Sequence, residues 1–171
     1  MLVLGKQLEG KNILSLRIGR PVGVATQPII NPNNLKIEGW HAIDSSKKDE
    51  RIMLSQDVRD ILPQGFVVND HDALTPEDEL IRLKDQLNQN FTLVGKIVVS
   101  DGRKKLGKVA DYAFEKNSMF IQKLYVAQSV VKSFSGGTLI IDRSQIIEIT
   151  NKRITVKEPT VKEAEAVPVT A

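Results

Sequence analysis

Short runs of apolar and β-branched residues, each broken by turn-forming residues, recur along the chain and predict β-strands. In the second half these predicted strands cover residues 96–100, 106–114, 119–126, 138–142 and 153–157. Turn signals separate them, including Asp101-Gly102, which is typical of a tight hairpin. Residues 144–149 fit a brief helical turn as well as a strand, and both interpretations stay open. Closely spaced short strands indicate a small barrel or sandwich, so the fold class is expected to be mainly β.

An internal repeat divides the chain. Residues 8–15 match residues 93–100, and Gly10 corresponds to Gly95 at an offset of 85. The match continues at offset 84, where Trp40 corresponds to Leu124, and later at offset 88. Slips of this size are typical of changes in loop length, such as a proline-rich loop expected at residues 28–34. A repeat this long predicts two copies of one small domain.

A helical pattern separates the two copies. Thr75 is a good N-cap, a proline follows at the first helical position, and acidic residues fill the first turn. Leu80, Leu83 and Leu87 then share one face, which predicts an amphipathic helix over residues 76–88. We expect this apolar face to pack on one of the β units, because a barrel of about 70 residues buries only about 60% of its surface. Pairing with another chain is the alternative.

These patterns predict four parts: a first β unit at residues 1–71, a helical linker at 72–90, a second β unit at 91–158 and a tail at 159–171. The tail is rich in Pro, Ala, Glu and Val, and is expected to be disordered. No apolar run approaches the length of about 18 residues that a membrane span needs. No targeting signal is recognisable either. We therefore expect a cytoplasmic protein without a membrane span.

Composition narrows the chemistry. The 171 residues include no cysteine, which excludes disulfides, thiolate catalysis and cysteine metal sites. The two histidines, His41 and His71, are too few for a histidine-rich metal site within one chain. Residues 5–12 resemble a phosphate-binding loop but end in Asn12 where Ser or Thr is needed. Residues 69–72 carry three potential ligands but fit an ordinary turn better. We expect no enzyme activity, cofactor or metal.

Charge concentrates in the second half. The chain has a net charge of +3, whereas residues 91–158 carry 12 basic and 6 acidic residues. The densest cluster is Arg103, Lys104 and Lys105, together with Lys108, at the tip of a predicted hairpin. These four residues form the candidate partner-binding site, suited to phosphates or to an acidic protein surface. A solvated basic turn is the alternative.

RNA recognition usually adds exposed aromatic side chains that stack on bases. The nearest aromatic residues to the basic cluster are Tyr112 and Phe114. Their positions in a predicted strand favour the core instead.

The second copy resembles the PRC-barrel family. Residues 93–102, Leu-Val-Gly-Lys-Ile-Val-Val-Ser-Asp-Gly, followed by residues 106–111, Leu-Gly-Lys-Val-Ala-Asp, are similar to the opening hairpin of that family. The strand at 121–126 and the closing segments near 139–146 and 154–156 continue the likeness. The first copy matches more loosely. The family is named for the cytoplasmic domain of the photosynthetic reaction-centre H subunit, and it includes the C-terminal domain of a ribosome maturation factor.

The resemblance implies two tandem small β barrels that bind other proteins. No catalytic residue carries over, while Gly95, Gly102 and Gly107 carry over as turn-forming glycines. The chain lacks the membrane helix of the H subunit and the N-terminal domain of the maturation factor. We expect a non-enzymatic adaptor or assembly factor that binds a protein partner in a larger complex. The alternative is a ribosome- or RNA-associated maturation factor that uses the basic second barrel, and a homo-oligomer stays open.

Overall fold

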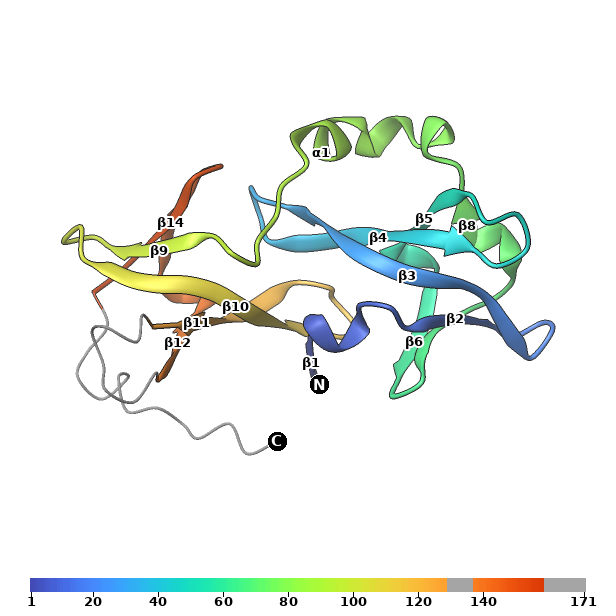
Figure 1. The fold of residues 1–171 in the computed structure, drawn as a ribbon, viewed down its shortest axis with the longest axis horizontal. Helices are drawn as coiled ribbons and strands as arrows, with labels where there is room; N and C mark the ends of the chain where they lie inside the picture. Colours follow the sequence, from blue (N-terminus) through green and yellow to red (C-terminus); the bar gives the residue numbers. More distant parts are fainter. Residues whose placement is uncertain (129–136, 159–171) are drawn as a thin grey trace.

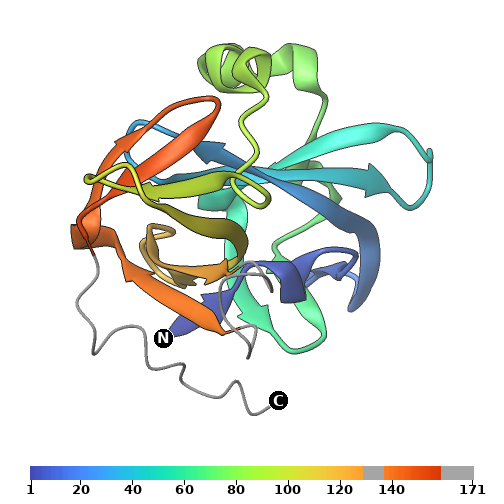
Figure 2. The same ribbon diagram turned by 60° about the vertical axis from the view of Figure 1, so that its left-hand side comes forward.

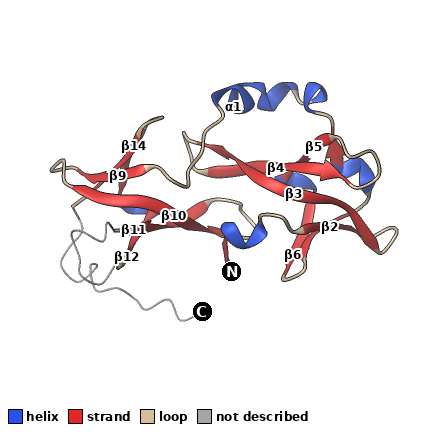
Figure 3. Ribbon diagram, in the orientation of Figure 1, coloured by secondary structure: helices blue, strands red, loops and turns tan. Residues whose placement is uncertain are grey.

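The computed structural model describes residues 1–128 and 137–158, and β-strands make up most of it (Figure 3). The chain is therefore mainly β, as predicted. The tail predicted at residues 159–171 lies outside the described residues. Within them, no helix combines the length and the apolar character required to cross a membrane.

The first sheet has seven strands in the order β6-β7-β2-β3-β4-β5-β8. All neighbours are antiparallel except β2 and β7, which run parallel. Its strands are β2 (Asn12–Ser15), β3 (Arg20–Asn31), β4 (Lys36–Asp44), β5 (Glu50–Leu54), β6 (Val58–Leu62), β7 (Gly65–Val68) and β8 (Leu74–Thr75).

The second sheet repeats this topology. Its order is β13-β14-β9-β10-β11-β12, and β9 and β14 are the parallel pair. Its strands are β9 (Ile97–Ser100), β10 (Lys105–Glu115), β11 (Ile121–Ala127), β12 (Thr138–Asp142), β13 (Ile146–Ile149) and β14 (Arg153–Val156). A 3₁₀ turn at Arg143–Gln145 precedes β13, so residues 144–149 contain both a turn and a strand. The sequence repeat is therefore a repeat of topology.

The two sheets do not close into the barrels that the sequence predicts. β6 and β8 remain at the ends of the first sheet, and β12 and β13 at the ends of the second. The two inner faces bury one continuous core instead. The ring of Trp40 on β4 lies 4.7 Å from Phe66 in its own sheet and 6.1 Å from Phe114 in the other, measured between centroids. Sharing a core compensates for the small area that each repeat buries alone.

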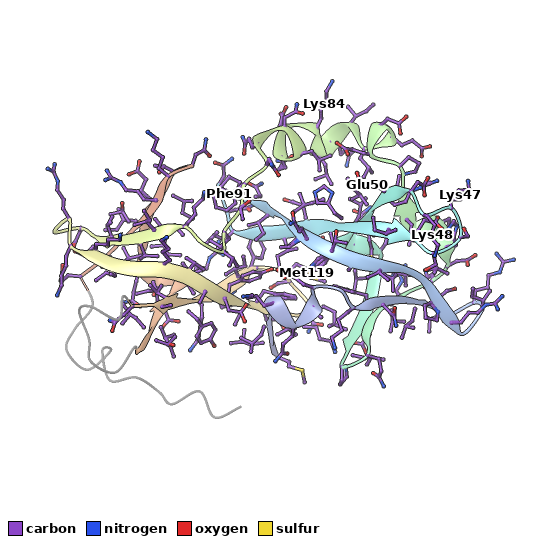
Figure 4. The ribbon with its side chains drawn as sticks, viewed as in Figure 1. Lys47, Lys48, Glu50, Lys84, Phe91 and Met119 are labelled. Atoms are coloured by element: carbon purple, nitrogen blue, oxygen red, sulfur yellow. The ribbon has the colours of Figure 1, made fainter. Side chains whose placement is uncertain are left out.

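Equivalent residues meet where the repeats join. The backbone N–H of Ile37 donates to the carbonyl of Met119, and the N–H of Ile121 donates to the carbonyl of Leu35, both at 2.9 Å. The two bonds are related by the same offset of 84 residues. Leu35 and Met119 also share a left-handed backbone, with φ of +57° and +64°. Met119 lies at the middle of the molecule (Figure 4). The junction therefore has approximate twofold symmetry, as in an isologous dimer interface.

The first strand of the chain falls within the first predicted unit, residues 1–71, but pairs with the second sheet. β1 (Leu2–Leu4) pairs antiparallel with β10, with Val3 opposite Phe114. The N–H of Gly5 then donates to the carbonyl of Tyr112 at 2.9 Å. The chain crosses back to the first sheet through a 3₁₀ turn at Lys6–Leu8. Residues of the first predicted unit thus take part in both sheets.

The linker contains less α-helix than predicted. Thr75 ends β8 instead of capping a helix, and two 3₁₀ turns follow at Glu77–Glu79 and Ile81–Leu83. Only α1 (Lys84–Gln89) is α-helical. The predicted apolar face is nevertheless present and packs on the first sheet, over Ile29 and Ile52. Figures 1 and 2 show these turns and α1 standing over one side of the molecule.

Candidate functional site

The basic cluster lies where the sequence places it, at the tip of the β9–β10 hairpin. The loop holds residues 101–104 and is closed by the N–H of Ser100 donating to the carbonyl of Lys104 at 2.8 Å. The buried Ser100 hydroxyl oxygen also accepts the N–H of Lys104 at 3.1 Å. Arg103 has a left-handed backbone with φ of +64°. The turn is therefore longer than the two-residue turn expected from Asp101-Gly102.

Two of the three glycines carried over from the family resemblance have the expected backbone. Gly95 has φ of +93° and Gly107 has φ of +150°. A Cβ at Gly107 would lie 2.1 Å from the carbonyl oxygen of Ala127, so the neighbouring strand also requires glycine there. Gly102 lies in the turn, but its φ is not positive. Arg103 takes the left-handed position instead.

The four basic side chains are exposed. Arg103, Lys104, Lys105 and Lys108 form no ion pair with any residue of the described segments. Asp101 shares the tip, and its carboxylate accepts the N–H of Glu158 at 3.0 Å. The Glu158 carboxylate lies beside Gly102, so two carboxylates flank the cluster and the tip carries both signs of charge.

The aromatic residues near this tip belong to the core, as predicted. Tyr112 is 2% exposed and Phe114 is fully buried. Neither can stack on a nucleic-acid base without unfolding the sheet. The tip thus offers charge without an aromatic platform.

The equivalent tip of the first repeat carries apolar side chains, which our sequence interpretation missed. It lies between β2 and β3, where Leu16 is 63% exposed and Ile18 is 47% exposed. The buried Ser15 closes this turn much as Ser100 closes the other, accepting the N–H of Ile18 at 3.4 Å. Arg17 forms an ion pair with Asp70 at 2.8 Å. The available signal was the position of Leu16 and Ile18 directly before Gly19, where the chain can turn.

The two tips point away from each other, at opposite ends of the long axis (Figure 1). The β2–β3 tip is called the apolar tip below, and the β9–β10 tip the basic tip. Because the repeats share one topology and one core, both tips are held in fixed positions. Equivalent places in the two repeats therefore present different chemistry.

Residues 69–72 form a turn, as predicted, and belong to a polar network behind the apolar tip. Asp70 accepts the N–H of His71 at 2.7 Å and caps the 3₁₀ turn at His71–Ala73. The His71 ring lies 2.5 Å from the carboxylate of Asp44, which is fully buried. Within the described part of the chain, no three His, Asp or Glu side chains gather closely enough to hold a metal ion.

Asp44 stays charged in its buried position. Burial alone would raise its pKa, but hydrogen bonds from the Ser46 hydroxyl, from the backbone of Ser46 and Lys47, and from His71 outweigh it. The pKa of Asp44 is therefore held well below its ordinary range. The carboxylate ties the β4–β5 loop to the segment after β7, which supports the apolar tip.

A hollow lies between β3, the end of α1 and residues 90–94. Its lining includes Pro28, His41, Leu87, Asn90 and Phe91. Phe91 is labelled in Figure 4, at the crossing from α1 toward β9. The His41 side chain forms no hydrogen bond or ion pair with the residues that the structure describes.

No protein-family model matches this chain. The search of curated proteins also found no match. The geometry of the two tips and of the hollow is therefore the basis for a functional assignment.

Proposed function

We propose that this protein is a non-enzymatic adaptor that holds protein partners in a larger complex, as the PRC-barrel resemblance implies. One observation carries the proposal: equivalent hairpin tips at opposite ends of the molecule expose different side chains. A scaffold of this kind can bind one partner at each end. The chemistry of the tips then decides which surfaces they fit.

The apolar tip fits a shallow apolar pocket on a partner. Burying a large aliphatic side chain contributes about 1.5–3 kcal/mol, so Leu16 and Ile18 together offer a substantial anchor. The Arg17–Asp70 ion pair and the bond from the Leu16 N–H to the Val68 carbonyl hold the turn in place. Such pre-organisation lowers the entropy cost of binding.

The basic tip fits an acidic protein surface. Its basic side chains are free to pair, and the carboxylates of Asp101 and Glu158 beside them discriminate against a uniformly anionic polymer. A partner protein can place acidic groups opposite the basic side chains and a basic group opposite the carboxylates, and so complement both.

A tagged pull-down from native lysate tests the adaptor. Wild type is compared with L16S/I18S, with R103A/K104A/K105A and with I81S, each in nuclease-treated and untreated halves. Ile81 is 82% exposed on the 3₁₀ turn at Ile81–Leu83, which belongs to neither hairpin, so I81S is the matched control for removing an exposed apolar side chain. We expect proteins retained after nuclease treatment, with a different subset lost in each tip variant and none lost in I81S. Identical partner lists for all four proteins would contradict the proposal.

A second candidate function is an RNA- or ribosome-associated factor. The observation in its favour is the cluster of basic side chains without ion pairs at the basic tip. It predicts RNA binding whose affinity falls steeply with salt, and a log–log slope that R103A/K104A/K105A lowers by about 2–3. Salt-insensitive or absent RNA binding would exclude it.

A further inference from the structure

The long strands of the two repeats differ along one edge. On β10, β9 pairs with residues 105–108 and β1 pairs with residues 113–115. On β3, β2 and residues 10–11 pair as far as Ala25. Beyond Ala25, no strand in residues 1–128 or 137–158 pairs with this edge of β3. The place that β1 takes in one repeat is therefore open in the other.

The backbone groups at the open edge follow from the repeat. The Tyr112 carbonyl accepts a bond from the segment after β1, and Phe114 faces Val3. Their equivalents at offset 84 are Pro28 and Ile30. Since alternate residues of a strand direct both backbone groups to the same side, the Pro28 carbonyl and both polar groups of Ile30 face the open edge. Ile37 lies opposite Ile30 on β4, but its N–H donates to the Met119 carbonyl and not to the Ile30 carbonyl.

The helix explains why this edge stays open. Residues 87–89, equivalent to β1 at offset 85, form the end of α1. Leu87 packs with Ile29 on the outer face of β3 instead of extending beside the strand. The hollow lined by Pro28, Ile30 and Asn90 lies along the edge.

We infer that residues 28–30 of β3 accept an extended segment of a partner protein as an added antiparallel strand. This inference rests on the proposed adaptor function and identifies a third binding surface for it. Strand addition of this kind obtains affinity from main-chain hydrogen bonds and specificity from alternate side chains.

The pairing of β1 with β10 defines the chemistry of that segment. Val3 is half-buried and packs against the shared core, whereas Leu2 before it is exposed. The added strand therefore carries an aliphatic residue at its centre. Glu9 lines the hollow and Glu50 lines its continuation, whereas no Lys or Arg of the described residues lines either. A basic residue beside the aliphatic centre complements these carboxylates.

The free protein allows a first test by native-state hydrogen exchange of the full chain. The Ile30 amide has no strand partner, whereas its equivalent Phe114 pairs with β1. We expect Ile30 to exchange at least about 100-fold faster than Phe114, although both side chains are buried. Equal protection of the two amides would show that the edge is already occupied, and would overturn the proposal.

The second test titrates the ¹⁵N-labelled full chain with the capped peptide Met-Leu-Val-Leu-Gly-Lys, the β1 sequence with its basic neighbour. We expect shifts at residues 26–31 and 90–94, and slowed exchange of Ile30. Two control peptides separate the contributions: N-methylation of the valine removes a backbone donor, and Lys→Glu reverses the charge. Each should weaken binding at least about tenfold. No shifts, or shifts confined to residues 113–115, would refute the site.

The two proposals fail separately. If the tip variants lose their partners while the peptide leaves residues 26–31 unchanged, the adaptor proposal is supported and the strand-addition site on β3 is refuted. If the peptide binds at residues 26–31 but the pull-down retains no protein after nuclease treatment, the adaptor proposal is refuted and the peptide site is supported.

Discussion

Asp44 shows how one residue links the buried interior to an exposed surface. Its carboxylate is fully buried, and its hydrogen bonds keep its pKa below the ordinary range despite the cost of burial. A carboxyl group with a lowered folded-state pKa contributes stability above its unfolded pKa of about 3.9 and loses that contribution as the pH falls below it. The network behind the apolar tip should therefore be sensitive to acid.

The substitution Asp44→Asn should destabilise the protein by about 1–3 kcal/mol at pH 7, because charge-assisted hydrogen bonds are lost in a buried place. Urea unfolding at pH 7, 5, 4 and 3 would measure the difference from wild type. We expect that difference to shrink as the pH falls below about 4, because Asp44 takes up a proton in the unfolded wild type while it stays ionised in the folded state. Asp78→Asn, at an exposed position, is the control. A difference independent of pH would argue against this assignment.

The glycines of the basic hairpin give a second prediction at this scale. Gly107→Ala should cost at least about 2 kcal/mol, since a Cβ would meet the Ala127 carbonyl and the backbone is left-handed. Gly102→Ala should change stability by less than about 0.5 kcal/mol, because its φ is not positive and the added Cβ would meet only the flexible end of Glu158 at 3.3 Å and the Ser100 hydroxyl at an ordinary contact of 3.7 Å. Thermal unfolding of both variants checks this. Equal costs would restore Gly102 as a required turn glycine.

Elements of secondary structure show what the sequence pattern could and could not predict. Alternating apolar residues indicated the strands, and Thr138–Asp142 agrees with β12 at both ends. The linker contains less α-helix than predicted. The spacing of its leucines indicated which side chains are apolar, but not the backbone conformation that buries them. Leu80, with φ of −102° and ψ of 71°, interrupts the helix while the leucines around it keep contact with Ile29 and Ile52. Tertiary packing here overrides local propensity.

The 3₁₀ turn at Ile81–Leu83 allows a matched test of this packing. Leu83 is 8% exposed, whereas Ile81 on the same turn is 82% exposed. Leu83→Ala should destabilise the protein by about 2–4 kcal/mol through the cavity it leaves. Ile81→Ala should cost less than about 0.5 kcal/mol. Urea unfolding measures both, and similar values would mean that the linker is not anchored through its apolar face.

At the scale of the whole molecule, the repeat was predictable and its assembly was not. Hydrophobic patterning shows that one face of each strand is buried, but a buried face can close on itself or cover a second copy equally well. The contact between Trp40 and Phe114 shows that in this molecule the buried face of one repeat covers that of the other. The apolar tip was missed for a related reason, since Leu16 and Ile18 continue a strand pattern and only the fold shows that they leave the core.

A shared core predicts that the protein unfolds as one unit. Trp40, the single tryptophan, contacts both sheets, so its fluorescence should follow the same urea transition as far-UV circular dichroism. Phe114→Ala, in the other sheet, should shift both signals together. Two separate transitions, or a Phe114→Ala effect invisible to Trp40, would instead indicate independently folding repeats.

The twofold junction at Leu35 and Met119 has a consequence for what the molecule can evolve. Two separate identical chains joined in this way would carry the same tip at both ends, and any mutation would alter both at once. A single chain that holds both copies removes that constraint. One end can then keep its leucine and isoleucine while the other acquires arginine and lysine. Covalent fusion of the repeats is thus what allows a symmetric framework to carry two different tips.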